Sequence, residues 1–153
     1  LTADDQWERR LVLFNTHTRE KLDVCYARGV SYRPEALSAV NHILRDHRTN
    51  EVNPIDPRLL DLLCAIRSKA GPDACLHIIS GYRSPGTNRR LRQQGRGVAR
   101  KSLHMQGHAA DIRIPGLATS RLRRMALTLR QGGVGYYPQT DFVHVDIGPV
   151  RSW

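Results

Sequence analysis

The sequence predicts an α+β domain: a small, mainly antiparallel sheet with helices packed on it and a β-hairpin at the N-terminal end. Short runs of β-forming residues alternate with apolar residues at helical spacing, and Gly and Pro separate these runs. No internal repeat, low-complexity tract or long linker divides the 153 residues. With 40% hydrophobic residues, a chain of this length suits one core, so we expect a single domain over residues 1–153.

The first expected element is the hairpin, at about residues 10–26. Residues 10–14 (Arg-Leu-Val-Leu-Phe) and 21–26 (Lys-Leu-Asp-Val-Cys-Tyr) are rich in β-formers, and the polar link 15–20 joins them. We expect this hairpin to form an edge of the sheet or a flap. The remaining core of the domain then runs over about residues 34–153.

Two helices are expected after the hairpin. Pro34 suits the first turn of a helix, and apolar residues then recur at helical spacing as far as Leu44. Asp56 and Pro57 supply the N-cap and first residue of a second helix, whose leucine-rich stripe ends at Gly71. This second helix has the clearest boundaries of any element in the sequence.

A short buried strand is expected next, in the Cys-Leu-His-Ile-Ile run at residues 75–79. The segment 80–86 (Ser-Gly-Tyr-Arg-Ser-Pro-Gly) then reads as a loop that carries a single arginine. Residues 87–96 are expected to form a short basic helix, which the Gly-Arg-Gly sequence at 95–97 ends. A second loop carries the chain from there to His104.

The C-terminal part continues the alternation of strands and helices. Residues 108–114 alternate as a strand, and 119–131 place apolar residues on one helical face before two glycines end the helix. Two final strands are expected near 134–137 and 141–147. These elements complete a sheet covered by helices.

The charge of the chain is strongly positive. Lys and Arg total 24 against 14 Asp and Glu, a formal charge of +10, and such a field attracts polyanions. Nucleic acid, anionic lipid headgroups, anionic wall polymers and simple solvated helix faces are the alternatives. Aromatic residues make up only 6% of the chain, without a stacking motif typical of single-strand binders, so we expect no nucleic-acid partner.

The sequence predicts no membrane span and gives one sign of a processed or trimmed precursor. No apolar run approaches the roughly 20 residues that cross a bilayer. The chain opens at Leu1 and not at Met, which is the pattern of a processed precursor. The three cysteines, Cys25, Cys64 and Cys75, match no metal-binding spacing. In an oxidising compartment Cys64 and Cys75 could pair, or all three could remain thiols.

Three side chains have the chemistry of a metal site. His104 and Asp111 lie seven residues apart around a bend of small residues, and imidazole and carboxylate are ligands that zinc takes readily. In the strand 141–147, alternation places Phe142, His144 and Asp146 on one face and the valines on the other. The same rule puts Asp111 opposite the apolar face of its strand. Asp111 and His144 could therefore converge across paired strands.

The remaining histidines are expected to lie outside this site. His17, His42, His47 and His77 have no carboxylate at a useful spacing and are assigned structural or surface roles. His108 follows His104 by four residues, which is a ligand spacing on a helix. Gly107 and the β-like run after it argue against a helix there, so His108 is left out.

Three motifs follow one another along the chain: S-G-Y-R-S at 80–84, H-x-x-G-x-A-x-D at 104–111 and H-x-D at 144–146. In these motifs and their order the chain resembles the D-Ala-D-Ala type of zinc peptidases, and most of all the murein endopeptidase K group. The likeness extends to Leu-Arg-Asp-His-Arg at 44–48 and to G-x-x-R-x-W at 148–153. The resemblance implies a zinc metallopeptidase, exported to the periplasm of a Gram-negative cell, that cleaves peptidoglycan stem peptides or cross-links.

The resemblance also implies the ligand set and the position of one arginine. One zinc ion per chain would be held by His104, Asp111 and His144, and Arg83 would lie at the site. Arg83 is then the candidate cation for stabilising the oxyanion. Tyr82 is a candidate for shaping the substrate pocket.

The catalytic base has two candidates. Related peptidases commonly carry Glu three residues before the last histidine, and that position is Asp141 here, one methylene shorter. Asp141 reaches the site only if the strand begins with a turn after Pro138. Strand parity favours Asp146, which alternatively orients a ligand or binds substrate. We take Asp141 as the base and Asp146 as the alternative.

A different class of function is compatible with the same fold. A wall-binding module could hold anionic polymer by its positive charge without turning over substrate, and it would not need the three ligands, Arg83 and an acid together. We expect the enzyme, acting as a monomer on peptidoglycan peptides. Which peptidoglycan bond is cut, a D,D or an L,D cross-link or a terminal D-alanine, does not follow from the sequence.

Overall fold

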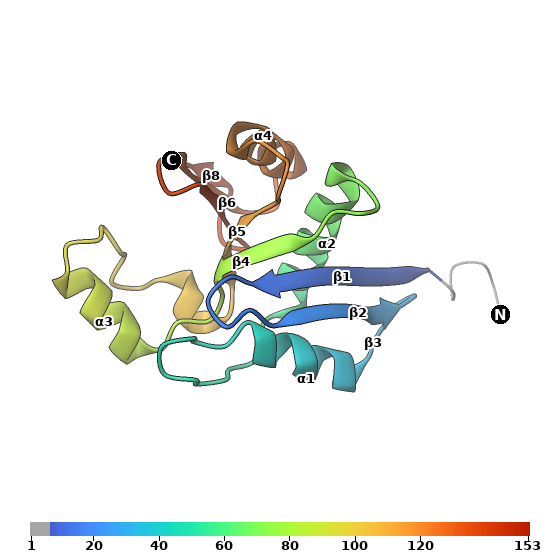
Figure 1. Cartoon of the computed structure of the whole chain (residues 1–153), viewed down its shortest axis with the longest axis horizontal. Helices are drawn as coiled ribbons and strands as arrows, with labels where there is room; N and C mark the ends of the chain where they lie inside the picture. Colours follow the sequence, from blue (N-terminus) through green and yellow to red (C-terminus); the bar gives the residue numbers. More distant parts are fainter. Residues whose placement is uncertain (1–6) are drawn as a thin grey trace.

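The computed structural model describes residues 7–153, and within them one eight-stranded sheet carries the fold in the order β3-β2-β1-β4-β5-β7-β6-β8 (Figure 1). The strands are β1 (Glu8–Asn15), β2 (Lys21–Arg28), β3 (Ser31–Tyr32), β4 (Leu76–Ser80), β5 (Ala109–Arg113), β6 (Gly133–Tyr137), β7 (Phe142–Asp146) and β8 (Arg151–Ser152). The helices are α1 (Pro34–Ile43), α2 (Pro57–Ala70), α3 (Pro85–Gln93) and α4 (Thr119–Leu129), with a short 3₁₀ helix η2 (Leu103–Gln106). The predicted α+β class is confirmed.

The sheet is mainly antiparallel, as predicted. Its two parallel pairs among the described strands are β1 with β4 and β6 with β8. The N-terminal hairpin is formed by β1 and β2, with Leu11 opposite Val24 and Phe14 opposite Lys21. Because β1 also pairs with β4, the hairpin extends the central sheet and is not a separate flap. The short strand β3 forms the edge beside β2.

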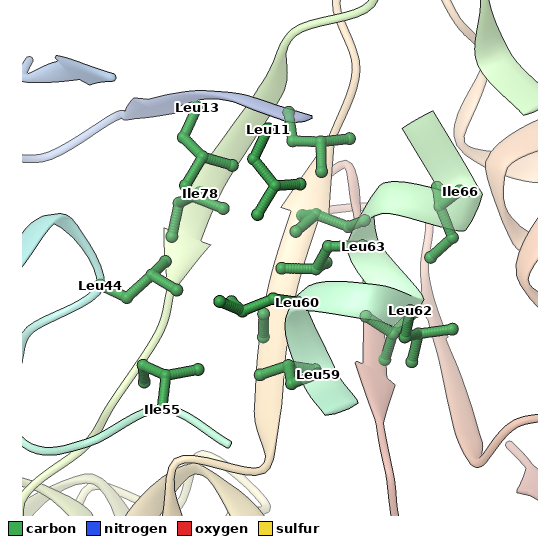
Figure 2. Packing of buried hydrophobic residues seen from close by; sticks show 14 of the residues in the cluster. Leu11, Leu13, Leu44, Ile55, Leu59, Leu60, Leu62, Leu63, Ile66 and Ile78 are labelled. Carbon is green, nitrogen blue, oxygen red and sulfur yellow. The ribbon is translucent and has the colours of Figure 1, made fainter. Parts of the chain in front are cut away.

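One face of the sheet is apolar, and helices α1, α2 and α4 pack on that side of the sheet. Alternate residues of the central strands point into it and are almost fully buried: Leu11, Leu13, Leu76, Ile78, Ala110, Ile112, Val143 and Val145. Figure 2 shows Leu60 and Leu63 of α2 in the same cluster as Leu11, Leu13 and Ile78 of the strands. Burial of this face fixes which side chains the strands present on the other face.

Helix α2 begins and ends as the sequence predicts. The Asp56 carboxylate accepts a hydrogen bond from the backbone N–H of Arg58, and Pro57 occupies the first turn. The helix stops at Gly71, whose φ of 126° is a conformation that other residues rarely adopt. Between these two ends, the leucine-rich face of α2 packs against the strands.

Helix α3 differs from its predicted range. It begins at Pro85 instead of residue 87, because the Ser84 hydroxyl caps it by accepting from the backbone N–H of Thr87. It ends at Gln93, before the glycines. Figure 1 shows α3 at the left of the molecule and the start of β1 at the right. The segments 81–84 and 94–102 on either side of α3 connect it to β4 and η2.

Two other expectations concern the thiols and the membrane. Cys25, Cys64 and Cys75 are all free in the structure, so the pairing of Cys64 with Cys75 is not formed. No helix within residues 7–153 combines the length and the apolar character needed to cross a bilayer.

We expect Leu60→Ala to destabilise the protein by about 2–5 kcal/mol, because the Leu60 side chain is fully buried between α2 and the sheet and its truncation leaves a cavity. Urea denaturation would measure the loss. Val52→Ala is the control, since Val52 is about half exposed and its truncation should change the free energy of unfolding by less than about 0.5 kcal/mol. Equal effects of both substitutions would contradict the assigned core.

Candidate metal centre

Three buried side chains meet on the polar face of the sheet. Asp111 on β5 and His144 on β7 are direct partners in the antiparallel pairing of these strands. Their Oδ1 and Nδ1 atoms lie 2.9 Å apart. His104 comes from η2, and its Nε2 lies 3.2 Å from Asp111 Oδ1 and 3.2 Å from His144 Nδ1. The three residues that sequence analysis selected thus converge at one point.

The spacing of these three atoms fits a metal ion. Ligand atoms at 2.0–2.1 Å from a tetrahedral zinc lie about 3.3–3.4 Å from one another. The observed separations of 2.9–3.2 Å need only a small expansion to reach that geometry. Two imidazole nitrogens and one carboxylate oxygen are also the donors typical of a catalytic zinc site, which leaves the fourth position to solvent or substrate.

His104 is held with its ligand nitrogen facing inward. Its Nδ1 lies 2.8 Å from the carbonyl oxygen of Gly81, so Nδ1–H donates there and Nε2 is left free. The backbone N–H of Arg83 donates in return to the carbonyl of His104. Gly81 is required at this point, because a Cβ would approach the Leu44 carbonyl oxygen to 2.5 Å. The segment 80–84 therefore docks on η2 and fixes its histidine.

Gly107 sets the bend between His104 and Asp111. It ends η2 with a φ of 69°, the left-handed conformation that glycine adopts at low cost. A Cβ there would also lie 2.3 Å from the Pro54 carbonyl oxygen. This confirms the predicted bend of small residues. His108, directly after it, contacts Asp56 at 3.5 Å and lies outside the cluster, as predicted.

Asp146 fixes the ring of His144 from the side away from the ligand atom. Its Oδ2 lies 2.8 Å from His144 Nε2, and its carboxylate also accepts from the backbone N–H groups of Gly133 and Gly148. Arg151 donates to both of its oxygens, at 3.1 and 2.8 Å. Asp146 is fully buried. This arrangement holds the ring of His144 in place, and the predicted role of Asp146 as the orienting partner of a metal ligand stays a prediction.

The electrostatics of the cluster favour a cation between its carboxylates. Burial favours neutral His144, but hydrogen bonds with Asp111 and Asp146 prevail and raise its pKa to about 8. Burial likewise opposes ionisation of Asp111, yet His104 and His144 hold the pKa of that carboxyl well below its usual range. A metal ion at Nδ1 of His144 would take the place of a proton, so metal binding is coupled to proton release.

A cavity of about 280 Å³ opens above the three side chains. Its lining includes an aromatic wall, formed by Tyr137, Phe142 and Trp153, and most residues of the segment 96–103. The Trp153 Nε1–H donates to the Tyr137 hydroxyl at 2.8 Å, and the rings of Tyr137 and Phe142 stack at 4.6 Å. The ligand residues lie at its floor, so a bound peptide could reach them from the open side.

The C-terminal strand brings Trp153 to the cavity. β8 pairs with β6, and the Trp153 ring lies 5.2 Å from the ring of His144. Gly135 of β6 makes this possible, because a Cβ there would come within 2.7–2.8 Å of the indole. The motif at 148–153 drew attention in the sequence, but nothing local indicated that its tryptophan forms a wall of the site.

Arg83 lines the cavity. Its guanidinium Nη2 lies 3.9 Å from Asp111 Oδ2, and Nη1 lies 3.4 Å from the Asn88 amide oxygen. The side chain is buried, and this burial lowers the pKa of the guanidinium from its usual value. Its Nε has no hydrogen-bond partner among the described residues. A buried, incompletely paired cation beside a metal centre is suited to stabilise developing negative charge.

Two other predicted residues lie away from the cavity. Asp141 is the last residue of the turn that begins at Pro138, and its carboxylate accepts from the Thr119 hydroxyl and lies 3.8 Å from Arg113. Tyr82 packs in the hydrophobic core and does not line the cavity. Their assigned roles in catalysis and substrate binding stay predictions.

Asp46 is a structural residue of the site that sequence analysis did not identify. Its carboxylate accepts from the backbone N–H groups of Ser84 and Arg48. Burial would raise its pKa, but these hydrogen bonds lower it to about 2. The segment 44–48 is thereby tied to the loop that carries Arg83. In the sequence, the only indication of this role was that Asp46 belongs to the motif at 44–48 that the chain shares with the family.

The comparisons with known proteins agree with this geometry. The family described as peptidoglycan L,D-endopeptidase MepK matches residues 3–153. The chain is 46% identical over 145 residues to the peptidoglycan L,D-endopeptidase MepK of Escherichia coli strain K12, which covers 95% of this chain and 80% of the relative. It is 41% identical over 146 residues to the probable peptidoglycan L,D-endopeptidase MepK of Haemophilus influenzae, covering 95% and 78%. The resemblance in the sequence is thus confirmed, and the chain belongs to the MepK family of peptidases.

Proposed function

We propose that the protein is a zinc-dependent endopeptidase that hydrolyses peptide bonds in peptidoglycan. The observation that carries this proposal is the convergence of His104 Nε2, Asp111 Oδ1 and His144 Nδ1 at the floor of an open cavity. The second nitrogen of each imidazole is already occupied by a protein acceptor, so the inward atoms are free for an ion. The names of the relatives support peptidoglycan as the substrate and an L,D bond as the bond cut.

The side chains of the site have different roles in the proposed hydrolysis. A zinc ion held by the three ligands would polarise the scissile carbonyl and lower the pKa of a water molecule. Arg83 lies beside Asp111 and donates to the oxyanion that forms at that carbonyl. The aromatic wall of Tyr137, Phe142 and Trp153 holds the peptide against the floor and limits access of bulk water.

The proton acceptor remains assigned to Asp141. Asp146 is unsuited to the task, because both its oxygens already accept hydrogen bonds and it is fully buried. Asp141 is exposed and precedes Phe142, which lines the cavity. Release of its contact with Thr119 would free the carboxylate to turn toward the floor. Asp111 is the one carboxylate among the described residues that line the cavity, and it is taken up as a ligand.

The place of action and the assembly follow from the proposed substrate. Peptidoglycan lies outside the cytoplasmic membrane, so we assign the protein to the periplasm as an exported enzyme. The site is complete within one chain, since all three ligands, Arg83 and the aromatic wall come from the same molecule. A monomer is therefore sufficient for activity.

Purified protein should digest peptidoglycan, lose this activity on chelation and regain it with zinc, because the cluster supplies no nucleophile of its own. Mass analysis of the released peptides would identify the bond. Asp111→Ala should lower the rate more than about 100-fold by removing a ligand, whereas the control His108→Ala should leave it unchanged. A protein that binds wall without zinc and is unaffected by Asp111→Ala would be a binding module.

Asp146→Asn should weaken zinc binding by about 10–100-fold, because Asp146 orients the ring of His144 through Nε2. Competition with a zinc-binding dye would measure the dissociation constant. Asp141→Asn is the matched control, since Asp141 contacts none of the ligands and should keep the wild-type affinity. If both variants bound zinc as tightly as the wild type, the orienting role of Asp146 would be refuted.

Asp141→Asn should lower kcat by about 10²–10⁴-fold with zinc content unchanged, because it removes the proton acceptor and not a ligand. Single-turnover digestion of a defined cross-linked peptide would measure this. Thr119→Ala removes the hydroxyl that Asp141 contacts and should preserve or raise kcat. A wild-type kcat for Asp141→Asn would show that another group takes the proton.

A further inference from the structure

The segment that forms one side of the cavity carries only positive charge. Between residues 74 and 110 the sequence contains no Asp or Glu. The same stretch contains seven cations: Arg83, Arg89, Arg90, Arg92, Arg96, Arg100 and Lys101. Solvated helix faces usually mix both signs, so this stretch departs from the ordinary pattern. No carboxylate of this segment therefore offsets the positive charge that it presents to the substrate.

Four cations line the cavity, and two of them are already engaged. Arg151 is bound to Asp146, and Arg83 lies between Asp111 and Asn88. Arg96 and Lys101 are different, because neither forms an ion pair with any residue that the structure describes. Both side chains are free to meet an anion that enters with the substrate.

The loop that carries Arg96 and Lys101 is held by hydrogen bonds to α3. The backbone N–H of Arg96 donates to the carbonyl of Leu91 at 3.3 Å. The buried Asn88 amide donates to the carbonyls of Ala99 and Arg100, at 3.0 and 3.4 Å. The loop backbone is thus ordered before any ligand binds. Ordering in advance lowers the entropic cost of binding at this place.

We propose that Arg96 and Lys101 bind a free carboxylate of the peptide substrate beside the scissile bond, so that the enzyme selects cross-linked peptides that are acidic at this point. This inference rests on the proposed function and names the substrate class of the same site. The cavity spans both the ligand residues at its floor and these two cations on its wall. A peptide bound in this cavity can therefore present a carbonyl to the candidate ligands and an anion to Arg96 and Lys101.

The carboxylate can belong to a side chain or to the end of the peptide chain. Four forms of one cross-linked peptide separate these sources: both carboxylates free, the side-chain group amidated, the terminal group amidated, and both amidated. Amidation keeps the shape and removes the charge. The form whose amidation raises KM of the wild-type enzyme identifies the bound carboxylate.

Arg96→Gln and Lys101→Gln should each raise KM for the free peptide by roughly 10-fold, with kcat within about 3-fold of wild type. For the peptide amidated at the bound carboxylate, the same variants should have no further effect, as expected for partners of one interaction. Arg96→Lys should recover part of the loss. Arg92→Gln, on the exposed surface of α3 and outside the cavity, should behave as wild type.

Equal effects of the two variants on free and amidated peptides would overturn the inference, as would a wild-type KM that amidation leaves unchanged. Thermal unfolding and zinc content of each variant exclude a general loss of structure. Equilibrium titration of the same peptides, followed by tryptophan fluorescence, decides the case even without turnover. If the wild type cleaved none of them but bound the free form through Arg96 and Lys101, the proposed function would fail while the carboxylate site would stand.

Discussion

The pairing of β5 with β7 is the constraint on which the site depends. It sets Asp111 opposite His144 and, one step away on each side, Ala110 opposite Val145 and Ile112 opposite Val143. Burial of the second set forces the first set to the other face. A slip of one residue would bring the ligands to the core and the apolar residues to solvent. The hydrophobic core thus fixes the register, and the register brings together Asp111 and His144, two of the three proposed ligands.

Buried carboxylates tie the loops to this rigid pair of strands. Asp46 holds the loop that carries Arg83, and that loop in turn orients His104 through the Gly81 carbonyl. Asp146 joins His144 to the backbone of Gly133 and Gly148 and to Arg151. Each carboxylate has several donors, which offsets the cost of burying its charge. These contacts fix His104 on its short 3₁₀ helix, whereas the aromatic wall stands on β6, β7 and the C-terminal residue bonded to β6.

Periodicity predicted those parts of the molecule that local rules control. Alternation along β7 placed His144 and Asp146 on one face, and the Asp56–Pro57 pair located the start of α2, both as observed. Periodicity did not predict the long-range contacts. The register of β4 against β5 shifts between Ile78 and Ser80, so strand parity does not carry through to Tyr82, which enters the core. Trp153 reaches the site only because β8 pairs with β6 and Gly135 leaves room for its ring.

The formal charge of +10 does not describe how the cationic side chains act at the site, because the role of each one depends on the residues that it contacts. Arg151 is a structural tie to a buried carboxylate, and Arg83 lies beside Asp111, where we assign it to the oxyanion. Neither is left to bind a second anion, although both line the cavity. Arg96 and Lys101 have no such partner among the described residues, and the stretch around them is free of acids. Their charge is therefore available to a molecule that enters the cavity. At this place the general attraction for polyanions becomes a selection between substrates that have the same shape and differ in charge.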